Sequence, residues 1–261
     1  MIYTFSTKTD PGRARENNED SVAFDDVTQV AVLADGMGGY NAGEIASGMA
    51  TAFIKSEMSR WLSEAGKQAK TKEIRRALEI CVDNANRSIF NAANSNSQYQ
   101  GMGTTLVVAV FQESRLMLGH IGDSRCYRLR SGSFEQITKD HSLLQEQLDA
   151  GLLTMEQAAT STYKNLVTRA LGVDDTVLLE LNEYEVEPGD LYVLCSDGLS
   201  DMVDDVEIAS IVERDLTLEQ KADELIAVAN GHGGRDNISV LLAQVGVGKE
   251  KTGLIRRLLR K

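Results

Sequence analysis

The segment Val30-Ala31-Val32-Leu33-Ala34-Asp35-Gly36-Met37-Gly38-Gly39 is the part of the sequence that decides the fold. Its five consecutive apolar residues predict a strand that is buried on both faces. The aspartate stands where this strand would end, and the glycines beside it leave room for a ligand above the edge of a sheet. The segment Leu191-Tyr192-Val193-Leu194-Cys195-Ser196-Asp197-Gly198 repeats the arrangement, so two carboxylates are expected at strand ends.

Two more aspartates lie in similar glycine-rich turns. Asp123 belongs to Gly122-Asp123-Ser124-Arg125, and Asp236 belongs to Gly233-Gly234-Arg235-Asp236-Asn237, just before a strand-like run. Carboxylates that gather at one edge repel each other strongly unless a positive charge lies between them. Oxygen ligands favour Mg²⁺ or Mn²⁺ over zinc. The sequence therefore predicts a metal-dependent hydrolase whose site lies at one edge of a β-structure.

The order of hydrophobic patterns indicates an α+β fold, because strands and helices come in runs and not in alternation. Two sheets with helices on their outer faces would satisfy both the apolar strands and the helical stripes. The predicted strands cover residues 2–7, 21–24, 30–34, 106–111, 115–121, 125–129, 134–137, 177–186, 191–195 and 237–245. The predicted helices cover the patterns in residues 45–62, 74–89, 206–212 and 217–230, and the polar stretch 91–100 separates the first pair from the next strands.

The mostly polar segment 140–165 interrupts this order and is a candidate flap near a site. It contains two short helical patches, at residues 143–148 and 155–159, and Thr154 with Gln157 is suited to cap the second one. The simplest organisation is one domain over residues 1–246, followed by a basic amphipathic tail over residues 247–261.

Composition narrows the class of protein. The net charge of -12 argues against non-specific nucleic-acid binding, so no nucleic-acid partner is expected. The cysteines are widely spaced and sit in apolar patterns, at Cys81, Cys126 and Cys195, which is typical of free thiols in a reducing compartment. The sequence has no apolar run long enough for a transmembrane segment and no signal-peptide pattern at its start, so we expect a cytoplasmic protein.

Taken together and in this order, the motifs resemble the PPM family, the metal-dependent Ser/Thr protein phosphatases of type 2C, and its bacterial branch. The motifs are Arg15 with Asn18-Glu19-Asp20, Ala34 to Gly39, Gly103-Thr104-Thr105, Gly122 to Arg125, Ser196-Asp197-Gly198 and Gly234 to Asn237. Asp140-His141-Ser142 and Thr168-Arg169-Ala170-Leu171-Gly172 also look like family segments. The resemblance covers roughly residues 1–245, and six motifs in register are far more specific than any one of them. It implies a β-sandwich of two antiparallel sheets flanked by helices on both outer faces, with the metal site at one end of the sandwich.

The resemblance also implies the roles of individual residues. Asp35 would bridge two metal ions, Mn²⁺ or Mg²⁺, and attack on phosphorus would come from a hydroxide between them, with no phospho-enzyme intermediate. The Gly36 carbonyl would complete the coordination of the second ion. The other ligands would be Asp197 and Asp236 for the first ion, Asp20 with Glu19 in support for the second, and Asp123 with Asp197 for a third, weaker ion. Arg15 would grip the substrate phosphate, because a guanidinium fits an oxyanion in a bidentate manner.

The chain departs from the family at the general acid. Many members carry a histidine where this chain has Met37 or Tyr40, so either Tyr40 or a water would have to protonate the leaving group. Of the histidines present, His120 is expected to be a packed strand residue and His232 a loop residue. The role of His141 stays open between capping and support of the site.

Three functions are open at this stage. The first is a protein phosphatase for phosphoserine and phosphothreonine that opposes a bacterial Ser/Thr kinase, acting as a monomer on phosphorylated proteins. The second is a small-molecule phosphomonoesterase with the same site, and the third is a catalytically weak phospho-binding regulatory module. The tail would be a solvated terminus or would dock to an acidic partner or an anionic membrane surface.

Overall fold

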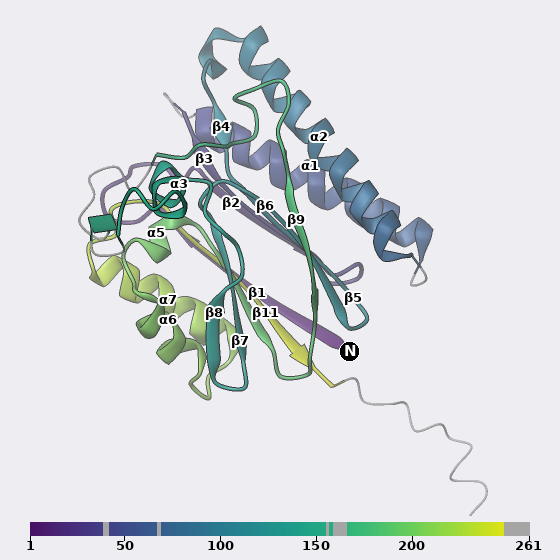
Figure 1. The fold of residues 1–261 in the computed structure, drawn as a ribbon, viewed down its shortest axis with the longest axis vertical. Coiled ribbons are helices and arrows are strands. Elements are labelled where there is room, and N and C mark those ends of the chain that lie inside the picture. Colours follow the sequence, from purple (N-terminus) through teal and green to yellow (C-terminus); the bar gives the residue numbers. More distant parts are fainter. Residues whose placement is uncertain (39–41, 67–68, 155–156, 159–165, 248–261) are drawn as a thin grey trace, which may run out of the picture.

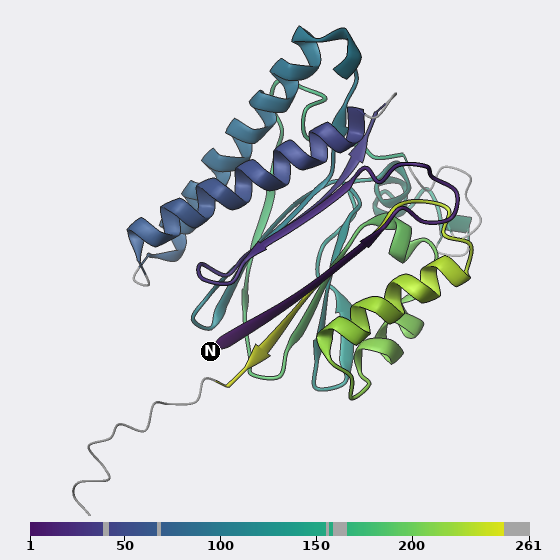
Figure 2. The same cartoon turned by 180° about the vertical axis from the view of Figure 1, so that it is seen from behind.

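The structure is a computed structural model that describes residues 1–38, 42–66, 69–154, 157–158 and 166–247. Two antiparallel sheets pack face to face, and a layer of helices covers the outer face of each (Figure 1). Seen from behind, the blue helices lie on one side of the sandwich and the yellow-green helices on the other (Figure 2). The α+β sandwich expected from the sequence is therefore confirmed.

The first sheet has the order β1-β11-β10-β7-β8, and the second has the order β2-β3-β5-β6-β9, with β4 paired to β3. The strands of the first sheet are β1 (Ile2–Asp10), β7 (Arg125–Arg130), β8 (Ser133–Gln136), β10 (Leu191–Cys195) and β11 (Ile238–Gly246). Those of the second are β2 (Asp20–Asp25), β3 (Val30–Met37), β4 (Gly103–Thr104), β5 (Leu106–Gln112), β6 (Arg115–Ile121) and β9 (Glu180–Glu185). All the strand pairs are antiparallel, so successive strands present alternate ends to the same edge of the sandwich.

Side chains alternate between two cores along the central strands. In β3, Ala31 and Leu33 lie in the core between the sheets, whereas Val30, Val32 and Ala34 pack toward the helices. Strands β5, β10 and β11 divide their residues in the same way between the middle core and an outer core. Because both faces are covered, these strands read as nearly continuous apolar runs.

Helices α1 (Ala42–Ala65) and α2 (Thr71–Ser95) cover the second sheet, and α5 (Asp197–Ser200), α6 (Asp205–Val212) and α7 (Leu218–Gly231) cover the first. The 3-10 turn η1 (Ser97–Tyr99) follows α2, and α3 (Leu143–Asp149) lies in the long connection between β8 and β9. In α1 the fully buried stripe is Ala46, Ala50 and Ile54, while Met49 and Phe53 are only partly buried. Small residues on the buried stripe let this helix lie close to the sheet.

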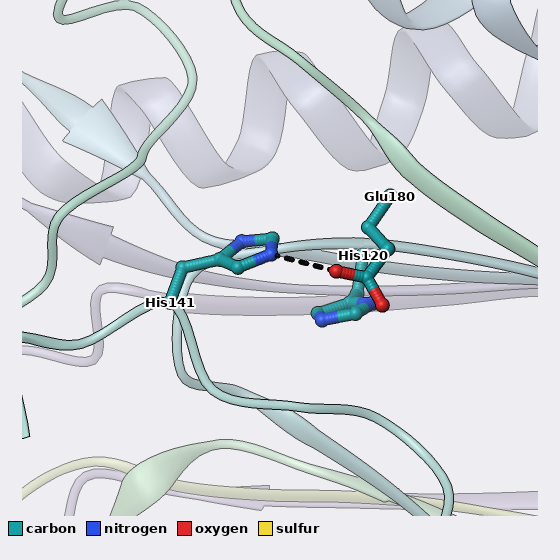
Figure 3. Close-up of side chains that lie close together, drawn as sticks. All are labelled: His120, His141 and Glu180. Carbon is teal, nitrogen blue, oxygen red and sulfur yellow. Dashed lines mark hydrogen bonds and ion pairs between the residues drawn. The ribbon is translucent and has the colours of Figure 1, made fainter. Parts of the chain in front are cut away.

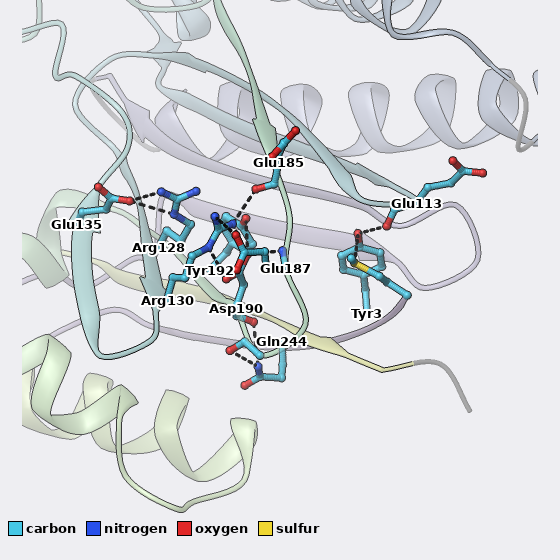
Figure 4. A network of polar contacts seen from close by, with 12 residues as sticks. Tyr3, Glu113, Arg128, Arg130, Glu135, Glu185, Glu187, Asp190, Tyr192 and Gln244 are labelled. Atoms are coloured by element: carbon cyan, nitrogen blue, oxygen red, sulfur yellow. Dashed lines mark hydrogen bonds and ion pairs between the residues drawn. The ribbon is translucent and has the colours of Figure 1, made fainter. Parts of the chain in front are cut away.

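The end of the sandwich where β10 begins is held by a polar network (Figure 4). The Arg130 guanidinium donates to both oxygens of Asp190, at 2.8 and 2.7 Å, and to the backbone oxygen of Glu185 at 2.7 Å. Tyr192 donates to the same carboxylate at 3.1 Å. These contacts join β7, β9 and β10 and leave the opposite end of the strands for the acidic turns.

Several element predictions need adjustment. The strand predicted over residues 177–186 is the shorter β9, and α2 continues through residues 91–95 of the stretch expected to separate elements. Within this last turn, the side chains of Asn94 and Ser95 donate to the backbone oxygens of Phe90 and Asn91, so they find partners inside the helix. The predicted helical patch 143–148 is confirmed as α3. The Thr154–Gln157 capping contacts are present at 2.9 and 3.3 Å, while most of the patch 155–159 lies outside the described residues.

The proposed division at residue 246 stays a prediction. Strand β11 ends at Gly246, and the tail from residue 248 onward lies outside the described residues. Within the described ranges, no helix combines the length and the apolar character that crossing a bilayer requires.

Candidate metal centre

Five aspartates from five different strand ends meet at one edge of the sandwich. Asp20 begins β2, Asp35 lies near the end of β3, Asp123 follows β6, Asp197 follows β10, and Asp236 precedes β11. Burial, and then the negative charges of the other four, raise the pKa of Asp35 well above its usual range. The structure thus brings together all five aspartates that the sequence predicted as ligands.

Asp35 is fixed through its backbone. It pairs with Asp20 directly across β2 and β3. Thr105 accepts a hydrogen bond from the Asp35 amide at 2.9 Å, and Thr104 donates to its backbone oxygen at 2.8 Å. Their partner in these bonds is Asp35, so they set the position of the proposed bridging ligand.

Gly36 occupies a place where no side chain fits. A Cβ at this position would lie 2.1 Å from the backbone oxygen of Gly43 and 2.5 Å from that of Glu19. The Gly36 amide donates to the same Glu19 oxygen at 3.1 Å. The first turn of α1 can therefore press against the strand end beside Asp35 only because residues 36 and 43 are glycines.

Ser196 links the turn that carries Asp197 to Asp20. Its hydroxyl donates to Oδ2 of Asp20 at 2.8 Å, whereas the buried Oδ1 of Asp20 has no hydrogen-bond partner within the described part of the chain. Burial raises the pKa of Asp20 to about 6, although hydrogen bonds from Ser239 and Ser196 oppose the shift. Burial, followed by the charge of Asp123, raises the pKa of Asp197 well above its usual range.

Asn237 organises the other side of the site, a role that its sequence neighbourhood alone does not reveal. Its side chain donates to the backbone oxygens of Pro11 and Asn17, at 3.0 and 2.8 Å, and accepts from the Glu19 amide at 2.8 Å. Because Asn237 directly follows Asp236, these bonds tie the loop before β2 to the turn before β11. The available signal was its place in the Arg235-Asp236-Asn237 motif.

Arg15 lies on this tied loop and contacts the carboxylate cluster. Its Nη2 is 2.8 Å from Oδ2 of Asp236, and 55% of its side chain is exposed. An exposed guanidinium at the rim of an acidic site can reach an incoming phosphate and still be oriented by one carboxylate. Its position agrees with the role expected from the sequence, which stays a prediction.

The turn that carries Asp123 is braced from two sides. Ser124 hydrogen-bonds to Thr105 at 2.7 Å, and Arg125 holds Asp140 through Nε and Nη2, at 3.0 and 2.7 Å. Burial, and then the charge of Asp140, raise the pKa of Asp123 to about 6. Ser124 and Arg125 therefore orient the turn.

The donor set of this edge suits a hard divalent cation. All the proposed side-chain ligands are carboxylates, and the unpartnered Oδ1 of Asp20 is an oxygen with no competing hydrogen bond among the described residues. Five carboxylates that are at least half-buried at one edge need a positive charge to offset their repulsion. A second group of possible metal ligands lies outside this carboxylate cluster. In the described part of the chain, His120, His141 and Glu180 have donor atoms that all lie within 4.8 Å of one another.

The histidine side chains bond to residues other than the proposed ligands. His120 is buried in β6 and His232 ends α7, where its Nδ1 donates to the backbone oxygen of Met202 at 2.8 Å, so both have the structural roles expected of them. Burial and the neighbouring His120 lower the pKa of His141. Met37 ends β3 opposite Gly103, and Tyr40, the alternative proton donor, lies outside the described residues.

The fold and the carboxylate edge are those of a metal-dependent hydrolase. A sequence profile of the family described as "Protein phosphatase 2C" matches residues 12–243. The chain is 38% identical over 244 residues to "Serine/threonine phosphatase stp" of Listeria innocua, covering 91% of this chain and 94% of the relative.

Solved structures of bacterial serine/threonine phosphatases have the same fold as this chain. The serine/threonine phosphatase of S. agalactiae superposes with a TM-score of 0.85 at 36% identity, over 94% of this chain and 100% of that one. The catalytic domain of PstP, solved in complex with two manganese ions, superposes with a TM-score of 0.81 at 36% identity, over 94% and 99% of the two chains. This chain therefore belongs to the protein phosphatase 2C family and is a metal-dependent protein phosphatase.

Proposed function

We propose that this chain hydrolyses phosphoserine and phosphothreonine in proteins with the help of two divalent ions, Mn²⁺ or Mg²⁺. The observation that carries the proposal is the meeting of five aspartates at one edge of the sandwich, where burial and their mutual repulsion raise the pKa of Asp35. A module that only binds phosphate would have no use for so costly a set of carboxylates.

The ligands divide by position. Asp35 sits beside Asp20 and within reach of the charges of Asp197 and Asp236, which supports a bridging role between two ions. We assign Asp197 and Asp236 to the first ion. The Gly36 carbonyl and Asp20, with Glu19 in support, are assigned to the second.

Asp123 would hold a further ion together with Asp197. The charge of Asp123 is the strongest electrostatic contribution to the shift in the pKa of Asp197, which supports the proximity of these two carboxylates. The resemblance to the family implies that this position is weaker than the other two.

The residues then supply positioning and charge. Two divalent ions, when bound, lower the pKa of a water and offset the charge of a phosphoryl group, so no nucleophilic side chain is required. Arg15 would orient the phosphate from the rim, while Asp35 and Asp20 stay ionised beside the cations. Asn237, Thr104 and Thr105 would keep these carboxylates in place during turnover.

The substrates and setting follow from family membership and remain proposals. Phosphorylated proteins, including a Ser/Thr kinase of the same cell, are the expected partners, since the relatives are named as serine/threonine phosphatases. The three cysteines are buried and free, which supports a reducing, cytoplasmic setting. A monomer would suffice, because all the proposed ligands come from one chain.

A turnover assay on a phosphothreonine peptide, with Mn²⁺ and with chelator, tests the proposal. We expect hydrolysis that needs Mn²⁺ and is lost in Asp35→Asn, but kept in Asp26→Asn, a matched change at an exposed residue after β2. Hydrolysis of small phosphomonoesters alone would indicate the small-molecule enzyme. Tight binding of the phosphopeptide without turnover would indicate a binding module.

A further inference from the structure

His141 lies at the junction of three segments that are far apart in sequence. Its ring stacks on that of His120, with centroids 4.6 Å apart and planes 14° apart, and points toward the Glu180 carboxylate (Figure 3). Both histidines are buried, with 6% and 1% of their surface exposed, and Nε2 of His141 is 3.3 Å from Oε2 of Glu180. The mechanism above makes no use of these residues.

The hydrogen bonds around His141 fix which ring nitrogen carries the proton. The Gly122 amide donates to Nδ1 at 3.1 Å, so Nδ1 must offer its lone pair, and Nε2 carries the hydrogen that Glu180 accepts. A metal ion would need a lone pair on Nε2, so its binding would break the hydrogen bond from Nε2 to Glu180. The Arg169 guanidinium, 3.5 Å from the same Nε2, places a positive charge where the ion would have to enter. The group of His120, His141 and Glu180 is therefore a structural cluster of hydrogen-bonded side chains and not a metal site.

The backbone of His141 joins the two ends of the segment between β8 and β9. Its amide donates to the Gly122 oxygen at 2.9 Å, and its own oxygen accepts from the Thr168 amide at 2.8 Å. Next to it, Ser142 and Val167 form a β-bridge. His141 thus bonds to Gly122 on one side and to the returning end of the segment on the other.

This contact reaches the proposed metal site through a single residue, because Gly122 directly precedes Asp123. Gly122 has a φ of +100°, and a Cβ here would lie 2.7 Å from the Thr105 side chain, so only glycine fits. Because glycine restricts its own backbone least, the geometry of the turn depends on contacts with its neighbours. Two contacts with the base of the segment hold it, the pair of bonds between Gly122 and His141 and the ion pair between Arg125 and Asp140.

We infer that His141 is a positioning residue, oriented by Glu180, which holds the Gly122–Asp123 turn in the geometry that lets Asp123 bind its metal ion. This inference rests on the proposed function, in which Asp123 is a ligand. It makes the weaker metal position depend on the base of the segment that follows β8, where His141 lies. His120 supports the ring by stacking, and its Nε2 donates to the Lys139 oxygen at 2.8 Å.

The test compares His141→Ala, His141→Asn and Glu180→Ala with the wild type and with Glu185→Gln, a matched control at an exposed position of β9. His141→Ala and Glu180→Ala should raise the Mn²⁺ concentration at half-maximal activity, on the order of tenfold for His141→Ala, as for other residues that orient metal ligands. His141→Asn keeps an acceptor near the place of Nδ1 and should recover most of the loss. Calorimetric Mn²⁺ titration, and exchange protection of the Gly122 amide, should change in parallel without reference to activity.

Asp123→Asn separates positioning from a general loss of stability. In that background, His141→Ala should cause no further shift in Mn²⁺ dependence, because the ligand that it orients is already lost. The inference would be overturned if His141→Ala shifted the Mn²⁺ dependence equally with and without Asp123, or did not shift it at all. It would also be overturned by a stoichiometric Zn²⁺ site that Glu180→Ala abolishes. If the wild type lacks Mn²⁺-dependent turnover, the proposed function fails. A different outcome is that the wild type turns over and Asp123→Asn needs more Mn²⁺, but His141→Ala has the Mn²⁺ dependence of the wild type. In that case only the inference about His141 fails.

Discussion

Asp20 and Asp35 face each other directly across β2 and β3, so two carboxylates share a half-buried cross-strand pair. Like charges placed opposite each other on neighbouring strands destabilise a sheet, and burial increases the penalty. Thr104, Thr105 and Ser196 hold the pair in place by hydrogen bonds. Such an arrangement is unfavourable for the sheet by itself and becomes favourable when a cation binds there.

The first prediction is that activity and stability change in opposite directions in Asp35→Asn. In chelator the variant should melt higher than the wild type, on the order of 5 °C for the relief of one to two kcal/mol. It should lose turnover and lose the rise in melting temperature that Mn²⁺ gives the wild type. Thermal melts with and without Mn²⁺ check this, with Asp26→Asn as the control that changes neither quantity. A chelated Asp35→Asn that melts below the wild type would show that the repulsion is already relieved within the chain.

The second prediction concerns the pH dependence of the chelated protein. The pKa values of Asp20 and Asp123 are raised to about 6 in the folded state, against about 3.9 for an unfolded aspartate. The folded state therefore binds more protons between these values, and stability is lost as the pH rises through this window. Each group contributes on the order of 2–3 kcal/mol at most. Melting temperatures in chelator should fall between pH 4 and pH 7 less steeply in Asp20→Asn than in the wild type. Identical slopes would contradict the prediction.

The third prediction ranks the ligands. Asp197→Asn and Asp236→Asn should abolish turnover at any Mn²⁺ concentration, because the first ion loses a charged ligand. Asp123→Asn should keep turnover but need more Mn²⁺ to reach half of its maximum. Metal titrations of activity and heat distinguish the two behaviours. An Asp123→Asn protein that binds no metal, beside an Asp236→Asn protein that binds normally, would reverse the assignment.

The arrangement of the fold could be read from the sequence because burial leaves a direct trace in it. The run from Val30 to Ala34 is apolar throughout since it faces two cores, and this pattern alone predicts a covered central strand. The buried face of α1 leaves a weaker trace in the sequence. Its buried positions Ala46 and Ala50 are small, and small residues give a weak hydrophobic signal although they decide how close the helix lies.

The carboxylates could be predicted because their type and their glycine neighbours are unusual at strand ends. The residues that hold the carboxylates in place could not be predicted. Asn237 and Ser196 act through side-chain bonds to partners more than 170 residues away, and no local pattern records such a contact. The same holds for His141, whose partners Gly122 and Glu180 come together only when β6 and β9 pair.

The fourth prediction concerns Arg15. Arg15→Ala should raise KM for phosphopeptides on the order of tenfold, since a charge-assisted hydrogen bond to the phosphate is lost. Because Arg15 also contacts Asp236, the Mn²⁺ titration is measured beside the kinetics to show whether the metal positions are kept. Arg13→Ala, at an exposed position of the same loop, is the matched control. Unchanged kinetics in Arg15→Ala would make this arginine an ordinary surface charge.

The last prediction concerns Asn237, whose side chain makes three hydrogen bonds to the loop before β2. In Asn237→Ala the buried groups left without partners should cost on the order of 1–3 kcal/mol in the free energy of unfolding. The loop that carries Arg15 would also come loose from Asp236, so turnover should fall further than stability alone explains, and additional Mn²⁺ should not restore it. Chemical denaturation and phosphopeptide kinetics measure the two effects, with Asn94→Ala as the control because Asn94 is exposed and bonds to one backbone oxygen. If Asn237→Ala loses stability but keeps full kcat and KM at a temperature where it is folded, then Asn237 supports the fold without positioning the site.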